Sequence, residues 1–238
     1  MAGTVHDIVF LLDCDDTLLD NDRVQADLGE RIEMMFGAEG RTRYWQEFEH
    51  LREQLGYVDY LGALQRCRDP HSGDPRLLQL ANYLLDYPFA ERLYPQALQT
   101  LTHLRRWGPT VVLSDGDVVF QPHKLERSGL WQAVDGRVLV YIHKELMLDD
   151  VERRYPARHY VMVDDKPYLL EAIKRHWGAR VTTVLPLQGH YAHDPRYASC
   201  RAPDLPLPDI GALLQLDLAT LRAVAALGQP HITRSISS

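Results

Sequence analysis

The chain has 238 residues and a mass of 27.3 kDa, which excludes a single small module and predicts one large domain or a core with one insertion. Hydrophobic residues make up 45% and charged residues 25%, the balance of an ordinary globular protein. The net charge is −7, and no long run of like charge occurs. A protein that binds nucleic acid needs a positively charged face, so the composition argues against nucleic acid as a partner.

The cysteines and the N-terminus indicate the compartment. Cys14, Cys67 and Cys200 are far apart and lack CxxC spacing, so neither a disulfide framework nor a zinc site is predicted. The N-terminal residues do not resemble a signal peptide, and no segment approaches the roughly 18 apolar residues that a membrane span needs. We expect a cytoplasmic protein that does not associate with membranes.

Five short apolar runs have the length and composition of buried strands of a parallel sheet. They are residues 8–12, 110–113, 137–142, 160–163 and 180–185. Helical patterns lie between the later strands, at residues 95–107 and 168–177, and a last one covers residues 217–227. The alternation of strand and helix predicts an α/β fold built on a doubly wound parallel sheet.

Residues 20–90 interrupt this alternation, because they contain amphipathic helical patterns and no convincing strand. The predicted helices are residues 22–36, 41–55, 57–67 and 75–87. We therefore predict a core of residues 1–19 and 91–238, with a small all-helical domain of residues 20–90 inserted after the first strand.

The first strand ends in an acidic cluster, and the edge at which parallel strands end is where open α/β sheets bind ligands. Asp13 and Asp15 are two residues apart, so in extended backbone their carboxylates point the same way, and Cys14 points the other way into the core. Adjacent carboxylates need a compensating charge, which Mg²⁺ supplies with a preference for oxygen ligands. The predicted metal ligands are Asp13, Asp15, Asp164 and Asp165.

A hydroxyl and an ammonium group complete the predicted site. Ser114 and Lys144 follow two other strands, and together with the metal they match the charge of a phosphate group. Asp13 is then the candidate nucleophile and Asp15 the candidate general acid and base, so the predicted catalytic residues are Asp13, Asp15, Ser114 and Lys144. The predicted substrate-binding residues are Asp16, Thr17, Ser114, Asp115, Gly116 and Lys144.

Four motifs in this order resemble those of the haloacid dehalogenase superfamily of hydrolases, over residues from about 6 to 190. They are the DxDxT sequence of residues 13–17, Ser114 after a strand, the isolated Lys144, and the acidic pair of residues 164 and 165. The resemblance implies a Rossmann-like core, a helical cap of type I formed by the insertion, and a small-molecule substrate.

Two residues depart from the pattern of that superfamily. Asp16 stands where a glycine is often found, and Glu145 follows Lys144 where a proline is frequent. Lys124 is therefore a rival for the phosphate-binding role, and we favour Lys144 because it ends a predicted strand. Arg23, Arg52 and Tyr57 are interpreted as surface positions of the insertion rather than as substrate contacts.

The resulting hypothesis is a Mg²⁺-dependent phosphatase that hydrolyses a small phosphorylated metabolite through an aspartyl-phosphate on Asp13, as a monomer or homodimer. One alternative is a 2-haloacid dehalogenase, which needs no metal and lacks the second aspartate of the motif, whereas Asp15 is present here. The others are a phosphohexose mutase and a non-catalytic binding protein with the same fold.

Overall fold

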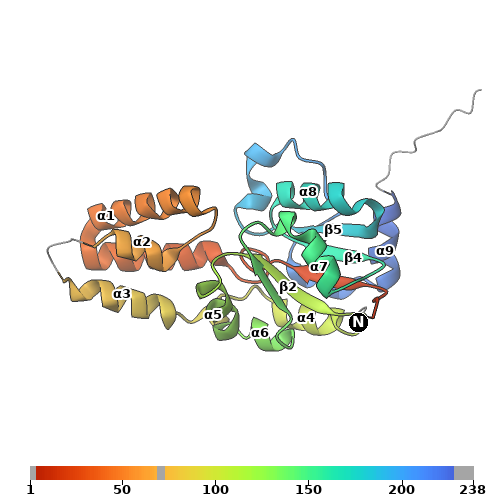
Figure 1. Ribbon diagram of the computed structural model, residues 1–238, viewed down its shortest axis with the longest axis horizontal. Coiled ribbons are helices and arrows are strands. Elements are labelled where there is room, and N and C mark those ends of the chain that lie inside the picture. Colours follow the sequence, from red (N-terminus) through yellow and green to blue (C-terminus); the bar gives the residue numbers. More distant parts are fainter. Residues whose placement is uncertain (1–3, 69–72, 228–238) are drawn as a thin grey trace, which may run out of the picture.

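Six parallel strands form the centre of the protein in the computed structural model, which describes residues 4–68 and 73–227. Their order across the sheet is β3-β2-β1-β4-β5-β6. The strands are β1 (Val9–Leu12), β2 (Thr110–Asp115), β3 (Val138–Tyr141), β4 (Tyr160–Val163), β5 (Val181–Pro186) and β6 (Leu205–Leu207). The predicted doubly wound parallel sheet is confirmed, because helices cover both of its faces (Figure 1).

The burial of β1 on both of its faces explains why its sequence is an uninterrupted apolar run. Phe10 and Leu12 pack in one hydrophobic cluster, and Val9 and Leu11 pack in a second one on the opposite face. The first cluster includes residues of α4 (Ala97–Leu104), α5 (Phe120–Arg127), α6 (Leu130–Ala133) and α9 (Leu218–Leu227). The second includes residues of α7 (Leu148–Arg154) and α8 (Pro167–Trp177). A strand buried on both faces has no polar positions to alternate with.

The edge strand β6 was not predicted. It lies in a proline-rich stretch and pairs only with β5. Pro206 is tolerated there because an edge strand leaves one side of its backbone unpaired. Asp204 joins this segment to the sheet: its Oδ2 accepts hydrogen bonds from Thr183 N at 2.9 Å and from Lys174 Nζ at 2.6 Å.

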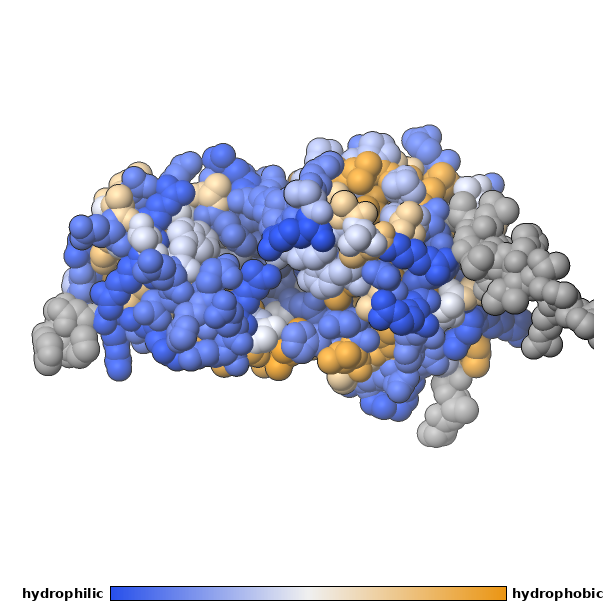
Figure 2. All heavy atoms as spheres, turned by 90° about the horizontal axis from the view of Figure 1, so that it is seen from above, coloured by the Kyte–Doolittle hydropathy of each residue, from blue (hydrophilic) through white to orange (hydrophobic). Residues whose placement is uncertain are grey.

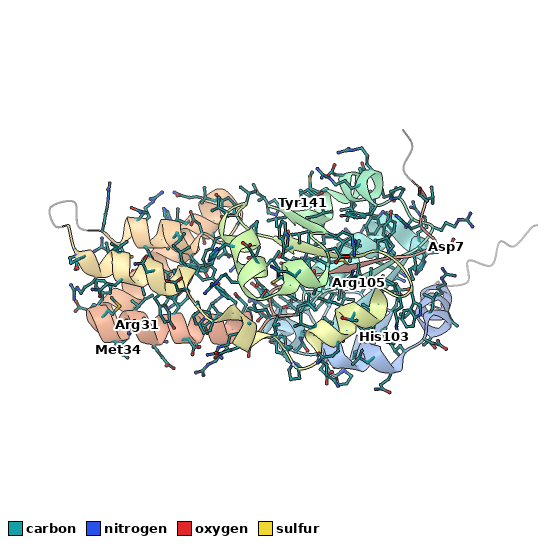
Figure 3. The ribbon with its side chains drawn as sticks, turned by 90° about the horizontal axis from the view of Figure 1, so that it is seen from below. Asp7, Arg31, Met34, His103, Arg105 and Tyr141 are labelled. Atoms are coloured by element: carbon teal, nitrogen blue, oxygen red, sulfur yellow. The ribbon has the colours of Figure 1, made fainter. Side chains whose placement is uncertain are left out.

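The inserted helices form a separate lobe at one end of the molecule (Figure 1). They are α1 (Asn21–Leu55), α2 (Tyr60–Arg66) and α3 (Pro75–Leu85). Gly37 has a φ of 74° and interrupts α1 between the two helices that the sequence predicted. Figure 3 places Arg31 and Met34 of this lobe at the far end of the molecule from Asp7.

The surface of this lobe is mainly hydrophilic in the view of Figure 2. Within the described part of the chain, no helix has both the length and the hydropathy needed to cross a bilayer. The helices bury apolar side chains against one another, as the tilted contact between the rings of Phe48 and Tyr60, with centroids 5.0 Å apart, illustrates.

We predict that the buried ion pair between Lys174 and Asp204 holds β6 and α8 on the sheet. Both side chains are almost fully buried, so Lys174→Met leaves an uncompensated carboxylate and lowers the free energy of unfolding by about 3–5 kcal/mol. The exposed pair of Arg175 and Glu171 on the same helix is the matched control, and Glu171→Gln should cost less than about 1 kcal/mol. Urea unfolding of the two variants measures both values, and equal losses would contradict the prediction.

Candidate active site

The candidate site lies where the strand order reverses, beside β1 and β4 at their carboxyl ends. Asp13 directly follows β1, and Asp164 and Asp165 directly follow β4. The register pairs Leu12 with Val163, so these acidic residues leave neighbouring strands at the same level. Ligands of open parallel sheets bind at such a switch point.

Asp13 is a buried carboxylate with one free oxygen. Its side chain is 1% exposed, and its Oδ1 accepts a hydrogen bond from Lys144 Nζ at 2.6 Å. Among the described residues its Oδ2 has no hydrogen-bond partner. Burial raises the pKa of Asp13, but the charge of Lys144 lowers it further, so the net pKa lies below its usual value and the group is ionised at neutral pH.

Lys144 opens the short 3₁₀ helix Lys144–Leu146 that follows β3, and its side chain is fully buried. Its Nζ lies 2.6 Å from Asp13 Oδ1 and 2.6 Å from Asp164 Oδ2. Burial lowers the pKa of Lys144, but the two carboxylates more than offset this and raise it above the usual value. Of the two lysines that the sequence left in competition, Lys144 is the one that contacts Asp13.

The acidic residues fit a divalent cation. Asp13, Asp164 and Asp165 are all buried, and each brings a carboxylate oxygen to within 4.8 Å of the others. In the described structure both oxygens of Asp165 lack a hydrogen-bond partner. Burial raises the pKa of Asp164 to about 6 and that of Asp165 well above its usual value, a cost that a bound cation relieves. The carboxylate of Asp15 is not part of this cluster.

Asp15 instead pairs with the second lysine. Lys124 reaches from α5, and its Nζ lies 2.6 Å and 2.7 Å from the two oxygens of Asp15. Gln121 Nε2 donates to Asp15 Oδ2 at 3.3 Å, and Lys124 also donates to Asn21 Oδ1 at 3.4 Å. Asn21 in turn accepts from the hydroxyl of Tyr60 at 3.3 Å, so a chain of hydrogen bonds joins Asp15 to the inserted helices.

Ser114 and Thr17 are buried beside the acidic cluster. Ser114 Oγ accepts a hydrogen bond from Gln121 Nε2 at 2.9 Å, and Thr17 Oγ1 accepts from Asp165 N at 3.0 Å. Thr17 therefore ties the turn after β1 to the end of β4. Asp115 Oδ1 accepts from Lys144 N at 2.8 Å, which connects the ends of β2 and β3.

Asp16 adopts a left-handed backbone conformation. This conformation explains why glycine is common at the same position of the DxDxT motif. The φ of Asp16 is 58°, in the left-handed region that aspartate tolerates better than most residues. Its Oδ1 accepts from the backbone N–H groups of Asn21 and Asp22, at 2.9 Å and 3.0 Å, and so holds the start of α1. Burial, together with the charges of Asp22 and Asp15, raises the pKa of Asp16 to about 7.

A second group of potential ligands lies at the same turn. Asp16, Asp22 and His190 bring their ligand atoms together, but His190 Nδ1 already contacts Asp22 Oδ1 at 2.6 Å. His190 N also donates to Asp22 Oδ2 at 3.0 Å. These contacts satisfy the group internally, in contrast to the unpartnered oxygens of Asp165.

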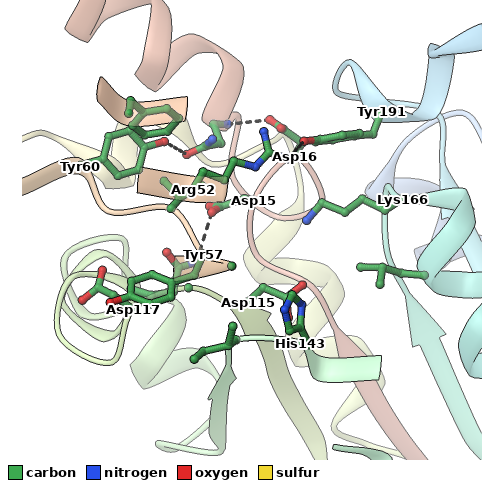
Figure 4. Close-up of a pocket in the computed structure, with 18 of the residues that line it drawn as sticks. Asp15, Asp16, Arg52, Tyr57, Tyr60, Asp115, Asp117, His143, Lys166 and Tyr191 are labelled. Atoms are coloured by element: carbon green, nitrogen blue, oxygen red, sulfur yellow. Dashed lines mark hydrogen bonds between the residues drawn. The ribbon is translucent and has the colours of Figure 1, made fainter. Parts of the chain in front are cut away.

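A cleft of about 640 Å³ separates the inserted helices from this edge of the sheet (Figure 4). Four predicted site residues line it, namely Asp15, Asp16, Asp115 and Gly116. Asp13, Ser114, Thr17, Lys144, Asp164 and Asp165 are buried and are not part of its lining. Arg52 and Tyr57, which were interpreted from the sequence as surface positions, also line the cleft, whereas Arg23 pairs with Asp27 and is not part of the lining.

Lys166 is a further lining residue that sequence reasoning missed. It precedes α8 and points into the cleft in Figure 4, and its Nζ lies 5.5 Å from the ring centroid of Tyr191. Burial lowers the pKa of Lys166, but Asp13 and Asp165 raise it more, so the side chain carries a positive charge. The sequence signal that could have identified Lys166 is its position directly after the acidic pair of Asp164 and Asp165.

The comparisons with known proteins agree with this geometry. Residues 9–176 match the family model of haloacid dehalogenase-like hydrolases. A haloacid dehalogenase-like hydrolase of Burkholderia xenovorans LB400 has 60% sequence identity and a TM-score of 0.85, with 91% of this chain and 98% of that one covered. No curated protein matches the chain.

More distant structures share the fold alone. The L-2-haloacid dehalogenase of Xanthobacter autotrophicus, with chloropropionic acid covalently bound, has 18% identity and a TM-score of 0.59 over 87% of this chain and 97% of that one. The hydrolase YfnB of Bacillus subtilis, bound to magnesium, has 14% identity and a TM-score of 0.59 over 89% and 100%. With the family model covering most of the sheet and all of the inserted helices, the chain belongs to the haloacid dehalogenase-like hydrolases.

Proposed function

We propose that this hydrolase is a Mg²⁺-dependent phosphatase that hydrolyses a small phosphorylated metabolite through an aspartyl-phosphate on Asp13. The observation that carries the proposal is the buried group of Asp13, Asp164 and Asp165, with unpartnered oxygens beside the ammonium of Lys144. Three buried carboxylates close together are energetically costly, because they repel one another and lose their hydration. A reaction that needs no metal would gain nothing to offset this cost.

Mg²⁺ fits this group because it prefers carboxylate oxygens. Asp13, Asp164 and Asp165 would hold it through their side chains, and Asp15 through its backbone carbonyl. When bound, the metal supplies positive charge that neutralises the oxygens of a phosphoryl group. The remaining steps depend on the protein's own side chains.

In the first step Asp13 attacks phosphorus. A bond forms between its carboxylate oxygen and phosphorus, and the bond from phosphorus to the leaving oxygen breaks. Lys144 holds Asp13 Oδ1 at 2.6 Å and so fixes the direction of the carboxylate. Ser114, Lys144 and Lys166 supply the hydroxyl and the positive charges that favour the charge developing on the phosphoryl oxygens.

Asp15 completes both halves of the reaction. It lines the cleft, where it protonates the leaving oxygen in the first step. In the second step it takes a proton from a water molecule, which attacks phosphorus and breaks the bond to Asp13 to release inorganic phosphate. Lys124 and Gln121 hold both of its oxygens and orient it for these transfers.

The proposal predicts release of inorganic phosphate from small phosphate esters with Mg²⁺ and none after treatment with EDTA. No chloride should be released from 2-chloropropionate with or without metal. The assay should include para-nitrophenyl phosphate and a hexose phosphate, with a sugar bisphosphate added separately to detect a mutase. Metal-independent release of chloride would assign the dehalogenase instead, and inactivity towards every compound would favour a binding protein.

We expect Asp13→Asn to lower turnover of para-nitrophenyl phosphate by a factor of about 10⁴ or more, because the amide is no nucleophile. Asp7→Asn is the matched control, since Asp7 is an exposed aspartate that precedes the same strand. Steady-state kinetics and circular dichroism of the two variants separate catalysis from folding. Retained hydrolysis in a folded Asp13→Asn protein would overturn the assignment of the nucleophile.

Direct binding of the metal tests the acidic cluster without reference to activity. Isothermal titration calorimetry with Mg²⁺ should detect one site in the unmodified protein, and Asp165→Asn should weaken binding at least about tenfold through loss of a charged ligand. Asp22→Asn is the control in the second acidic group and should leave the affinity unchanged. If Asp22→Asn instead removes binding, the metal belongs to the turn at α1.

A further inference from the structure

The cations around the cleft differ in how far their charges are already neutralised. Lys144 lies at 2.6 Å from carboxylates of both Asp13 and Asp164, and Lys124 binds both oxygens of Asp15. These two ammonium groups are fully buried. The positive charges of Lys144 and Lys124 are therefore already compensated by carboxylates before a ligand enters the cleft.

The positive charge of Arg52 is compensated less than the charges of Lys144 and Lys124. It belongs to the last turn of α1 and lines the cleft from the side of the inserted helices. Among the residues that the structure describes, its ion pair is with Glu49 at 3.4 Å, and that glutamate is 56% exposed. A long, exposed pair of this sort is worth only about 0–1 kcal/mol. The guanidinium group is therefore available to an anion that enters the cleft.

Tyr191 connects Arg52 to the phosphoryl end of the cleft. It belongs to the short 3₁₀ helix Tyr191–His193, which follows β5. Its hydroxyl accepts a hydrogen bond from Arg52 Nη2 at 2.9 Å, while Lys166 Nζ lies over its ring at 5.5 Å from the centroid. The two cations thus contact one tyrosine side chain, and Figure 4 shows both beside the cleft.

Acidic side chains line other parts of the cleft. Glu49, Glu53, Asp117 and Glu145 are among the lining residues, and each repels an anion. An anionic group on the substrate is therefore favoured at the guanidinium of Arg52 and disfavoured beside Glu53, Asp117 and Glu145. The planar guanidinium offers two parallel N–H donors, the arrangement that pairs with a carboxylate, and its single charge balances a carboxylate better than a second phosphate dianion.

We propose that Arg52, with the hydroxyl of Tyr191, binds a carboxylate of the substrate, and that the substrate class is small phosphorylated carboxylic acids. The inference rests on the proposed phosphatase activity, since it assigns the phosphoryl group to the end of the same cleft that Asp15 and Lys166 line, two residues along the chain from the buried Asp13. Arg52 acts on specificity and takes no part in the bond-making steps.

Three two-carbon phosphate esters test the inference, because they differ in the group distant from phosphate. Phosphoglycolate carries a carboxylate, ethyl phosphate is uncharged there, and phosphoethanolamine carries an ammonium. We expect kcat/KM with Mg²⁺ to be about 10 to 100 times higher for phosphoglycolate than for ethyl phosphate. This ratio corresponds to the free energy that a hydrogen bond between charged groups contributes. Arg52→Gln should remove this preference and leave ethyl phosphate within about threefold of its original value.

The matched control is Arg66→Gln, which removes an exposed arginine of α2 that does not line the cleft and should keep the preference. Tyr191→Phe removes the hydroxyl while it keeps the ring, and should lower the preference less than Arg52→Gln does. The inference is overturned if Arg52→Gln keeps the preference for phosphoglycolate, or if the unmodified protein prefers phosphoethanolamine.

A binding measurement separates failure of this inference from failure of the phosphatase proposal. In calorimetry with Mg²⁺, phosphonoacetate should bind about 10 to 100 times more tightly than methylphosphonate, and only Arg52→Gln of the two arginine variants should abolish the difference. Selective binding without release of phosphate from any ester overturns the phosphatase and leaves the carboxylate site standing. Equal affinities for the two phosphonates overturn the carboxylate site whatever the catalytic result.

Discussion

The ammonium group of Lys144, held between Asp13 and Asp164, is the interaction on which the site depends. It connects residues that follow β1, β3 and β4, and all three side chains are essentially out of water. Desolvation alone would drive these carboxylates to their neutral forms. Lys144 and Lys166 keep Asp13 ionised, but these two positive charges do not balance the three carboxylates of Asp13, Asp164 and Asp165. The unpartnered oxygens that remain are the reason this edge of the sheet suits a divalent cation.

The inserted helices are coupled to this charged edge through polar contacts at their point of entry. Asp16 turns the chain in a left-handed conformation and caps the first N–H groups of α1. From the other side, Lys124 links Asp15 to Asn21, and Asn21 continues the chain to Tyr60 in α2. A displacement of the helices therefore acts on the proposed acid and base as well as on the cleft wall. The same lobe carries Arg52 and Tyr57, which line the cleft, so the proposed carboxylate site belongs to the inserted helices.

Sequence reasoning succeeded where a local pattern had a single physical explanation. An apolar run such as residues 8–12, followed at once by aspartates, fits a strand buried on both faces with a polar end. The same argument located the end of β4 and the acidic pair that follows it, and it placed the ends of β2 and β3 within two residues, although Ser114 lies inside β2 rather than after it. It failed for β6, because Leu205–Leu207 contains a proline and forms a strand only through pairing with β5 and the ion pair of Asp204 with Lys174. It did not distinguish Arg52 from other exposed arginines on amphipathic helices, because only the fold places Arg52 at the cleft.

The sequence by itself determined five of the six strands, the inserted helices, the family and most of the charged residues of the site, because strand burial and motif order are properties of short segments. Only the tertiary structure decided which charges meet. It paired Lys144 with Asp13 and Lys124 with Asp15, withdrew the carboxylate of Asp15 from the metal cluster, and brought Lys166, Tyr191 and Arg52 to one cleft. The physical reason is that Coulomb attraction and desolvation depend on distance and burial, and both are set by how strands and helices pack rather than by spacing along the chain.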